Sequence, residues 1–245
     1  MKKAIVIGAS SGIGEEVVKL LLQEGWSVGI AARRLERLKN IQDKFGEDRV
    51  KIIDLDVKKE DAASKLEKLI LDLGGMDLYF HASGIGFQNV DLASEVEIDI
   101  AKTNSEGFIR LVTYAFNWFC NNNNKQGHIA IISSIAGTKG LGVSPAYSAT
   151  KAMQSTYIQS LCQLSKIRKA NIKFTDIRPG FVETDLLNKE KHYPLMMKKE
   201  KAAKSIIKGL KRKKRILIID WKFRLVVFVW RLIPNFIWER ISVKN

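Results

Sequence analysis

The sequence predicts a doubly wound α/β domain, with a parallel sheet of about seven strands and helices on both faces. Short β-branched runs alternate with amphipathic stretches along the chain, which indicates parallel strands joined by helices. Hydrophobic residues make up 46% of the 245 residues and charged residues 27%, as in a globular protein with a sizeable core. A glycine-rich turn joins the first strand to the first helix.

The predicted elements follow one another with short connections. Strands are expected at 3–7, 27–32, 50–57, 77–83, 128–134, 172–179 and 215–220. Helices are expected where apolar residues recur at helical spacing, at 14–25, 35–45, 65–73, 96–119, 146–166 and 199–210. Right-handed crossovers then give one dinucleotide-binding and catalytic domain over 1–220, followed by an apolar-basic tail over 221–245.

Charge is distributed unevenly along the chain. Of the formal net charge of +15, residues 189–245 carry +13, from 17 Lys and Arg against 4 Asp and Glu. The excess of positive charge is therefore a property of the last quarter of the chain and not of the main body.

Cysteine and histidine content argues against a disulfide framework or a metal site. Cys120 and Cys162 are the only cysteines and have no paired spacing, which fits a reducing compartment such as the cytoplasm. The three histidines form no ligand pattern, so we expect no metal. The chain opens directly on a strand-like segment, and no secretory leader is expected.

The turn "GASSGIG" places Gly8, Gly12 and Gly14 between a strand and a helix. Glycine lets the backbone turn tightly and approach a pyrophosphate, whose charge the helix N-terminus then meets. Glycine-rich turns also occur in α/β proteins that bind no nucleotide, but this setting favours a dinucleotide site. The spacing Gly-x-x-x-Gly-x-Gly resembles that of the short-chain dehydrogenase/reductase family, and the resemblance extends over about residues 1–188.

Further segments fall in the family's order. "DLDV" (54–57) resembles its adenine-pocket segment, and "RPGFVET" (178–184) resembles the segment that folds over the nicotinamide. "HASG" (81–84) stands where the family has Asn-Asn-Ala-Gly and keeps only the glycine, so backbone contacts are expected there. The resemblance implies a Rossmann-type three-layer sandwich that holds the dinucleotide with Gly8, Ser10, Ser11, Gly12, Ile13, Gly14, Arg33, Arg34, Asp56, Val57, Gly84, Tyr147, Lys151, Pro179, Gly180, Val182 and Thr184.

The end of the second strand bears on the choice of cofactor. An acid there binds the ribose 2′-hydroxyl of NAD and repels a 2′-phosphate. This chain has Ala32 at that place, followed by Arg33 and Arg34, whose guanidinium groups suit a phosphate. NADP(H) is therefore expected rather than NAD(H), although the two arginines would also suit the start of a solvated helix.

The stretch "AYSATKA" carries Tyr147 and Lys151 one helical turn apart, after the strand-end Ser134. A free tyrosine has a pKa near 10, poorly matched to proton transfer at neutral pH, and a nearby cation lowers it. Each residue alone has an ordinary structural explanation. Together they resemble the family's catalytic group, in which Ser134 orients the substrate oxygen, Tyr147 transfers the proton and Lys151 also binds the nicotinamide ribose. By the same resemblance, Asn104 in "KTNSEG" holds a water that connects Lys151 to solvent.

The region after Thr184 resembles the family's substrate lid, expected over about 184–200. Its apolar side chains would suit either a hydrophobic substrate or ordinary packing. They are Leu186, Leu187, Tyr193, Leu195, Met196 and Met197.

The tail 221–245 mixes tryptophan and aliphatic residues with cations, and it holds no uncharged apolar run as long as a membrane span. We expect it to lie on a membrane surface, as two short helices broken by Pro234. Contact with another subunit is a close alternative. Nucleic-acid binding through the basic cluster 211–215 ranks a distant third.

These observations predict an NADP(H)-dependent oxidoreductase that interconverts a carbonyl and a secondary alcohol on a hydrophobic small molecule. The resemblance also implies a homodimer or homotetramer, formed through the two long helices of the domain. The alternative is a redox sensor or scaffold that binds NADP(H) with little turnover. The altered "HASG" turn is the only sequence feature that favours it. A cytoplasmic protein, peripheral on the inner face of a membrane, fits either function.

Overall fold

One parallel sheet organises the chain. The computed structural model describes residues 1–122, 126–185 and 193–243. In this part of the chain, seven parallel strands run in the order β3-β2-β1-β4-β5-β6-β9, which confirms the predicted doubly wound fold. The strands are β1 (Lys3–Ile7), β2 (Ser27–Ala32), β3 (Val50–Asp54), β4 (Leu78–His81), β5 (Gly127–Ile132), β6 (Ile172–Arg178) and β9 (Ile216–Ile218).

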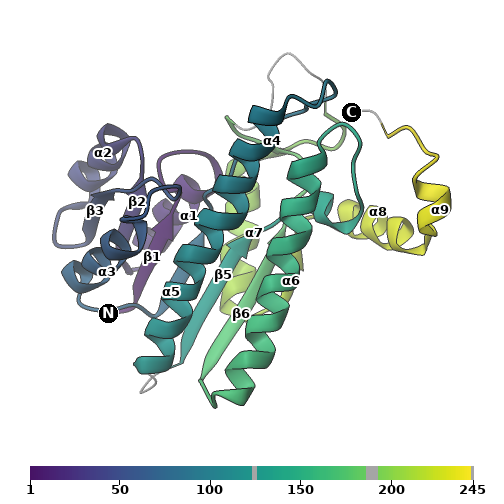
Figure 1. Ribbon diagram of the computed structural model, residues 1–245. Helices are drawn as coiled ribbons and strands as arrows, with labels where there is room; N and C mark the ends of the chain where they lie inside the picture. Colours follow the sequence, from purple (N-terminus) through teal and green to yellow (C-terminus); the bar gives the residue numbers. More distant parts are fainter. Residues whose placement is uncertain (123–125, 186–192, 244–245) are drawn as a thin grey trace.

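Helices cover both faces of the sheet (Figure 1). One face carries α1 (Gly12–Gln23), α2 (Leu35–Phe45) and α7 (Lys199–Lys211), and the other carries α3 (Ala62–Leu73), α5 (Phe108–Asn121) and α6 (Pro145–Ile167). Successive residues of a strand serve opposite layers: Ala4 and Val6 of β1 pack under the first group, Ile5 and Ile7 under the second. Burial on both faces explains why the strands read as continuous apolar runs.

Five strands end earlier than expected. β3 ends at Asp54 rather than at 57, β4 at His81 rather than at 83, β5 at Ile132 rather than at 134, β6 at Arg178 rather than at 179, and β9 at Ile218 rather than at 220. The segments that follow β3, β4 and β5 leave the sheet but remain partly buried around a cavity. Their sequences are therefore still apolar. Since β1 lies between β2 and β4, the chain reverses its direction of winding there, where doubly wound proteins place their ligands.

The helix expected over 96–119 is interrupted. It consists of α4 (Ser94–Ala101), a π-helical turn η1 (Lys102–Gly107) and α5. The wide turn contains Asn104, whose side chain bonds to the backbone of Ile85 instead of to solvent. Such π-turns are frequent at functional sites, and this one places Asn104 behind the cavity.

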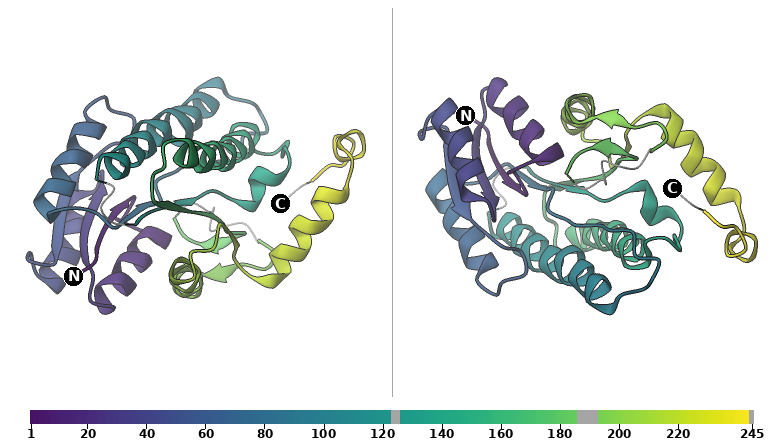
Figure 2. Two further views of the ribbon diagram at one scale, coloured as in Figure 1. Left: turned by 90° about the horizontal axis from the view of Figure 1, so that it is seen from below. Right: turned by 90° about the horizontal axis from the view of Figure 1, so that it is seen from above.

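The tail forms two helices, α8 (Trp221–Leu232) and α9 (Asn235–Trp238), and Pro234 separates them as predicted. They lie beyond the β9 edge of the sheet (Figures 1 and 2). Two short strands, β7 (Val182–Glu183) and β8 (Met197–Lys198), pair beside them, and a 3-10 turn η2 (Ile135–Thr138) follows β5. None of the described helices is long and apolar enough to cross a bilayer.

Candidate active site

A cavity of about 1120 Å³ lies at the carboxyl ends of the strands. It is continuous from the glycine turn to Tyr147, so it brings together residues far apart in sequence. Its lining includes every residue predicted to hold the dinucleotide, together with Ser134. Asn104 does not line it and is fully buried. The roles of these residues stay predictions.

The glycine turn fits a phosphate group. Gly8 has a φ of +84°, and a side chain there would meet the backbone nitrogen of Ser83 at 2.6 Å. A side chain on Gly14 would clash with the carbonyl oxygen of Gly8. The turn therefore lies tightly against the end of β4, and α1 begins at Gly12 with its N-terminus at the cavity. Free backbone N–H groups at a helix N-terminus are suited to a pyrophosphate.

The two arginines after β2 have different surroundings. Arg34 donates hydrogen bonds to the hydroxyl oxygens of Ser10 at 3.1 Å and Ser11 at 2.7 Å, so it braces the glycine turn. Its guanidinium also lies 3.8 Å from Asp185. Arg33 is exposed at the rim of the cavity. Arg33 is therefore the guanidinium that is available to an added phosphate.

Ser134 and Tyr147 face the cavity from neighbouring elements. Ser134 caps η2, and its hydroxyl oxygen accepts a hydrogen bond from the backbone N–H of Ala136 at 3.1 Å. With that lone pair engaged, the hydroxyl proton can be donated to another oxygen. Tyr147 lies in the first turn of α6, which starts at Pro145 because proline suits the first helical position.

Lys151 lies one turn after Tyr147, with its Nζ atom 5.7 Å from the centre of the tyrosine ring. This Nζ donates to the carbonyl oxygen of Ile132 at 2.9 Å and to Oε1 of Gln154 at 3.0 Å. Burial lowers the pKa of Lys151 to about 8, and the charge of the buried Asp176 opposes this shift. The ammonium is thus held at the cavity wall by neutral oxygens.

The pKa of Tyr147 differs from the expectation. Burial raises the pKa of its phenol, and hydrogen bonding with Ser134 lowers it, but the net direction is upward. The expectation that Lys151 produces a net lowering is wrong here, because removal from water disfavours the phenolate more than the partners stabilise it. Ser134 is thus the partner that lowers the pKa of Tyr147 against the effect of burial.

Asn104 and Gln154 form the support behind Lys151. The side chain of Asn104 accepts from the backbone N–H of Ile85 at 2.9 Å and donates to its carbonyl at 2.7 Å. The backbone carbonyl of Asn104 accepts from Nε2 of Gln154 at 2.8 Å. The side chain of Gln154 thus joins Lys151 to Asn104.

Gln154 was missed by the sequence analysis. Only its position offered a signal, since it follows Lys151 by three residues and so shares a face of α6. A second missed residue is Gly86, because a side chain there would meet Cε2 of Tyr147 at 2.6 Å. The missing side chain leaves room for the tyrosine ring.

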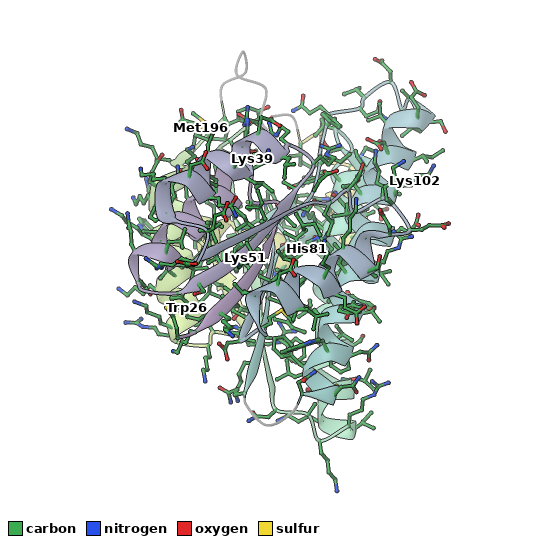
Figure 3. The ribbon with its side chains drawn as sticks, turned by 90° about the vertical axis from the view of Figure 1, so that its left-hand side faces the viewer. Trp26, Lys39, Lys51, His81, Lys102 and Met196 are labelled. Carbon is green, nitrogen blue, oxygen red and sulfur yellow. The ribbon has the colours of Figure 1, made fainter. Side chains whose placement is uncertain are left out.

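The altered "HASG" turn has a structural explanation. His81 lies in the interior of the protein, at the end of β4 (Figure 3). Its Nδ1 shares a hydrogen bond of 2.8 Å with the hydroxyl of Tyr79, and the ring of Phe108 packs edge-on against it. Burial lowers the pKa of His81 to about 3, so the ring is neutral. Ala82, Ser83 and Gly84 line the cavity, and His81 does not.

The tail contributes to the cavity wall, which the sequence analysis did not foresee. Phe223 and Val227 are buried against Ile135, with Phe181 and Ile218 packed around them. A side chain on Gly180 would clash with the ring of Phe223. The lining residues that come from the tail are Phe223, Val226, Trp230 and Val243.

The predicted lid lies partly outside the described residues, which include neither Leu186 nor Leu187. Of the remainder, Tyr193 and Leu195 line the cavity with Pro194, Met196 is exposed and Met197 packs in the core. No group of three or more His, Cys, Asp or Glu in the described ranges could hold a metal ion.

Comparisons with known proteins agree with this geometry. Residues 2–194 match the family model of the short chain dehydrogenases. An uncharacterised oxidoreductase of Myxococcus xanthus (strain DK1622) is 30% identical over 240 residues, covering 96% of this chain and 93% of the relative. A short-chain dehydrogenase from Sphingobium yanoikuyae, solved with NADPH, superposes with a TM-score of 0.80 at 17% identity, covering 100% of this chain and 98% of that one.

A 3-ketoacyl-(acyl-carrier-protein) reductase from Brucella melitensis, solved with NADH, superposes with a TM-score of 0.78 at 22% identity. That superposition covers 89% of this chain and 96% of the reductase. At such identities the solved structures establish a shared fold, whereas the family model covers most of the sequence. The protein belongs to the short chain dehydrogenase family of oxidoreductases.

Proposed function

We propose that the protein interconverts a carbonyl and a secondary alcohol on a hydrophobic small molecule, with NADP(H) as its cofactor. The observation that carries this proposal is the single cavity shared by the glycine turn and by Ser134, Tyr147 and Lys151. When bound, the nicotinamide supplies a hydride to the carbonyl carbon or accepts it back from the alcohol.

The residues of the chain handle the proton and the orientation of the substrate. Ser134 donates a hydrogen bond to the substrate oxygen, since its hydroxyl proton stays available while its oxygen accepts from Ala136. Tyr147 delivers its proton to that oxygen. Lys151 stabilises the phenolate that remains and donates to the ribose, while Gln154 and Asn104 hold it in place.

NADP(H) is preferred in this proposal because no acid stands at the end of β2. Ala32 ends the strand, and the exposed Arg33 can pair with a 2′-phosphate. The Sphingobium yanoikuyae neighbour with NADPH is consistent with this preference, and the Brucella melitensis neighbour with NADH keeps NAD(H) as the alternative.

The substitution Tyr147→Phe tests the mechanism. It should retain NADPH binding, measured by fluorescence titration, and should abolish turnover of the carbonyls that the wild-type protein reduces. Full turnover by Tyr147→Phe would overturn the assignment. Tight NADPH binding without turnover across a broad carbonyl and alcohol panel would instead favour a sensor.

We further propose a homodimer or homotetramer built through α5 and α6, as the family resemblance implies. We place the protein in the cytoplasm, with the tail at the inner face of a membrane. This placement is supported by the exposed apolar residues of α8 and α9. Size-exclusion chromatography with light scattering tests the first proposal, and vesicle sedimentation tests the second.

A further inference from the structure

Helix α8 has two apolar faces with different surroundings. Phe223 and Val227 are buried, while Val226 and Trp230 are partly buried beside them on the same face. This inward face forms part of the cavity wall. The opposite face is also apolar and lies open, with side chains from 47% to 67% exposed: Trp221, Leu225, Phe228, Val229 and Leu232.

The open residues form one stripe. At about 100° per residue they fall within a sector roughly 100° wide, opposite the sector that holds Phe223 and Trp230. Two apolar residues of α9, Phe236 and Ile237, are also 62% and 42% exposed. An apolar stripe of this size is unusual on a protein surface that faces only water.

Cations border the stripe on both sides. Arg224 and Arg231 lie along one edge, Lys222 lies along the other, and all three are exposed. Arg240 follows α9 and is also exposed. An apolar stripe with tryptophan and flanking cations matches the chemistry of an anionic membrane surface, where rings sink to the headgroup level and cations meet phosphates.

The tail is held firmly against the domain. Lys139 donates to the backbone carbonyl of Ile233 at 2.9 Å and to the side chain of Asn235 at 2.6 Å. Nε1 of Trp238 donates to the carbonyl of Gly140 at 2.7 Å, and its ring packs against Trp230. The stripe is therefore presented in a fixed orientation relative to the cavity, close to the chain that follows Ser134.

The cavity wall beside α8 suits an apolar compound. Of the charged lining residues, Arg33, Arg34, Asp56 and Lys151 belong to the predicted dinucleotide site or catalytic group, and Asp185 lies 3.8 Å from Arg34. Toward α8 the described lining consists of uncharged residues: Ile135, Leu141, Phe181, Tyr193, Leu195, Phe223, Val226 and Trp230. A polar or ionic substrate would find no charged partner among them.

We propose that α8 and α9 seat the protein on an anionic lipid surface, and that the substrate is a membrane-dissolved carbonyl or alcohol which enters the cavity along α8. The substrate part of this proposal rests on the proposed oxidoreductase function. A second copy of the chain fits the stripe less well, because packing two stripes against each other about a two-fold axis would bring the cations that border one stripe near those that border the other. The basic cluster 211–215 lies at the opposite end of β9 and adds nothing to this surface.

Sedimentation with vesicles tests the docking part. The wild-type protein should bind vesicles containing one third phosphatidylglycerol, bind phosphatidylcholine vesicles weakly, and lose affinity as salt rises. Leu225→Glu should weaken binding by about tenfold or more, and Leu225→Glu with Phe228→Glu by about a hundredfold. The matched control is Leu71→Glu on α3, which places the same charge at a leucine that is 69% exposed. It should bind as the wild type does.

Equal vesicle binding by the double variant and the wild type would overturn the docking. If light scattering showed a changed oligomeric state in the double variant while its vesicle binding stayed the same, the stripe would be a subunit interface. That result would also overturn the docking. Neither result depends on turnover, so both are distinct from a failure of the proposed activity.

Turnover tests the substrate part, with a series of aliphatic ketones whose short members dissolve in water and whose long members reside in vesicles. The double variant should reduce the short ketones like the wild type and lose at least about tenfold in rate on the vesicle-borne ones. Equal loss on both kinds would show that α8 acts only as a cavity wall and would overturn the membrane route. Absence of turnover by the wild type on the whole series would count against the proposed function while leaving the vesicle result intact.

Discussion

Gln154 joins Lys151 to Asn104 in the interior of the protein. Its Oε1 accepts from the ammonium of Lys151 at 3.0 Å, and its Nε2 donates to the backbone carbonyl of Asn104 at 2.8 Å. The two partners fix the direction of the amide, since only its oxygen can face the ammonium and only its nitrogen can face the carbonyl. Gln154 is 1% exposed, so water cannot readily replace it.

Gln154→Glu should shift the pH dependence of turnover. A carboxylate beside Lys151 favours the ammonium, so the pKa of Lys151 should rise above its value of about 8. The alkaline limb of the kcat/KM profile should shift to a higher pH by about one unit or more. Gln159→Glu, at an exposed position of the same helix, is the control and should leave the profile unchanged. An unshifted limb in Gln154→Glu would exclude this positioning role.

Gly86 should be required for placing Tyr147. Gly86→Ala puts a Cβ atom against the tyrosine ring, so the ring must move and turnover should fall by roughly tenfold to a hundredfold. NADPH affinity should stay close to wild type. In the control Gly142→Ala, the added Cβ meets nothing within 4 Å, and kcat should not change. Similar kcat values for the two variants would contradict the steric explanation.

Arg33 should carry the preference for NADPH. Arg33→Ala removes the exposed guanidinium and should weaken NADPH binding by about tenfold while leaving NADH binding unaffected. Arg34 is a poorer test, because it also braces Ser10 and Ser11. Lys39→Ala, on the exposed side of α2, removes one positive charge without touching the cavity and serves as the control. Equal losses for both cofactors in Arg33→Ala would remove the basis for the preference.

The buried His81 should make the protein sensitive to acid. Its pKa is lowered from 6.5 to about 3, so between these values the unfolded chain binds this proton and the folded chain does not. The free energy of unfolding should therefore fall as the pH drops from 6.5 toward 3. His128, whose burial also lowers its pKa, to about 4, acts in the same direction.

Urea unfolding at pH 6.5 and 4.5 measures this effect. His81→Asn should reduce the loss of stability between the two pH values by roughly 1–3 kcal/mol. His128→Asn provides a parallel comparison that keeps His81 in place. The same loss in His81→Asn and in the wild type would show that the histidine does not control acid stability.

The seven strands and the residues around the cavity could be predicted because each depends on local signals. The sequence alone shows the apolar runs, the glycines at a turn and the spacing of Tyr147 and Lys151. The π-helical turn at Asn104 has no such pattern, since it depends on a side-chain contact with Ile85 far from it in sequence. The net direction of the tyrosine pKa likewise depends on burial, which a spacing does not reveal.

The orientation of α8 could not be predicted for a different reason. Phe223 and Val227 on one face and Leu225 and Phe228 on the other are similar side chains. Their periodicity therefore does not say which face packs inward. The packing of Phe223 against Gly180 decides it, and that contact joins two segments that the sequence analysis treated separately.

The contact between Gly180 and Phe223 changes how a shortened protein should be interpreted. Removing the chain after Asp220 would take away any membrane contact, but it would also open one side of the cavity and uncover Ile135. Altered turnover in a truncated enzyme would thus mix two causes, loss of an anchor and loss of a wall. Only substitutions confined to the outer face of α8 can separate the effect of membrane association from the effect on substrate selectivity.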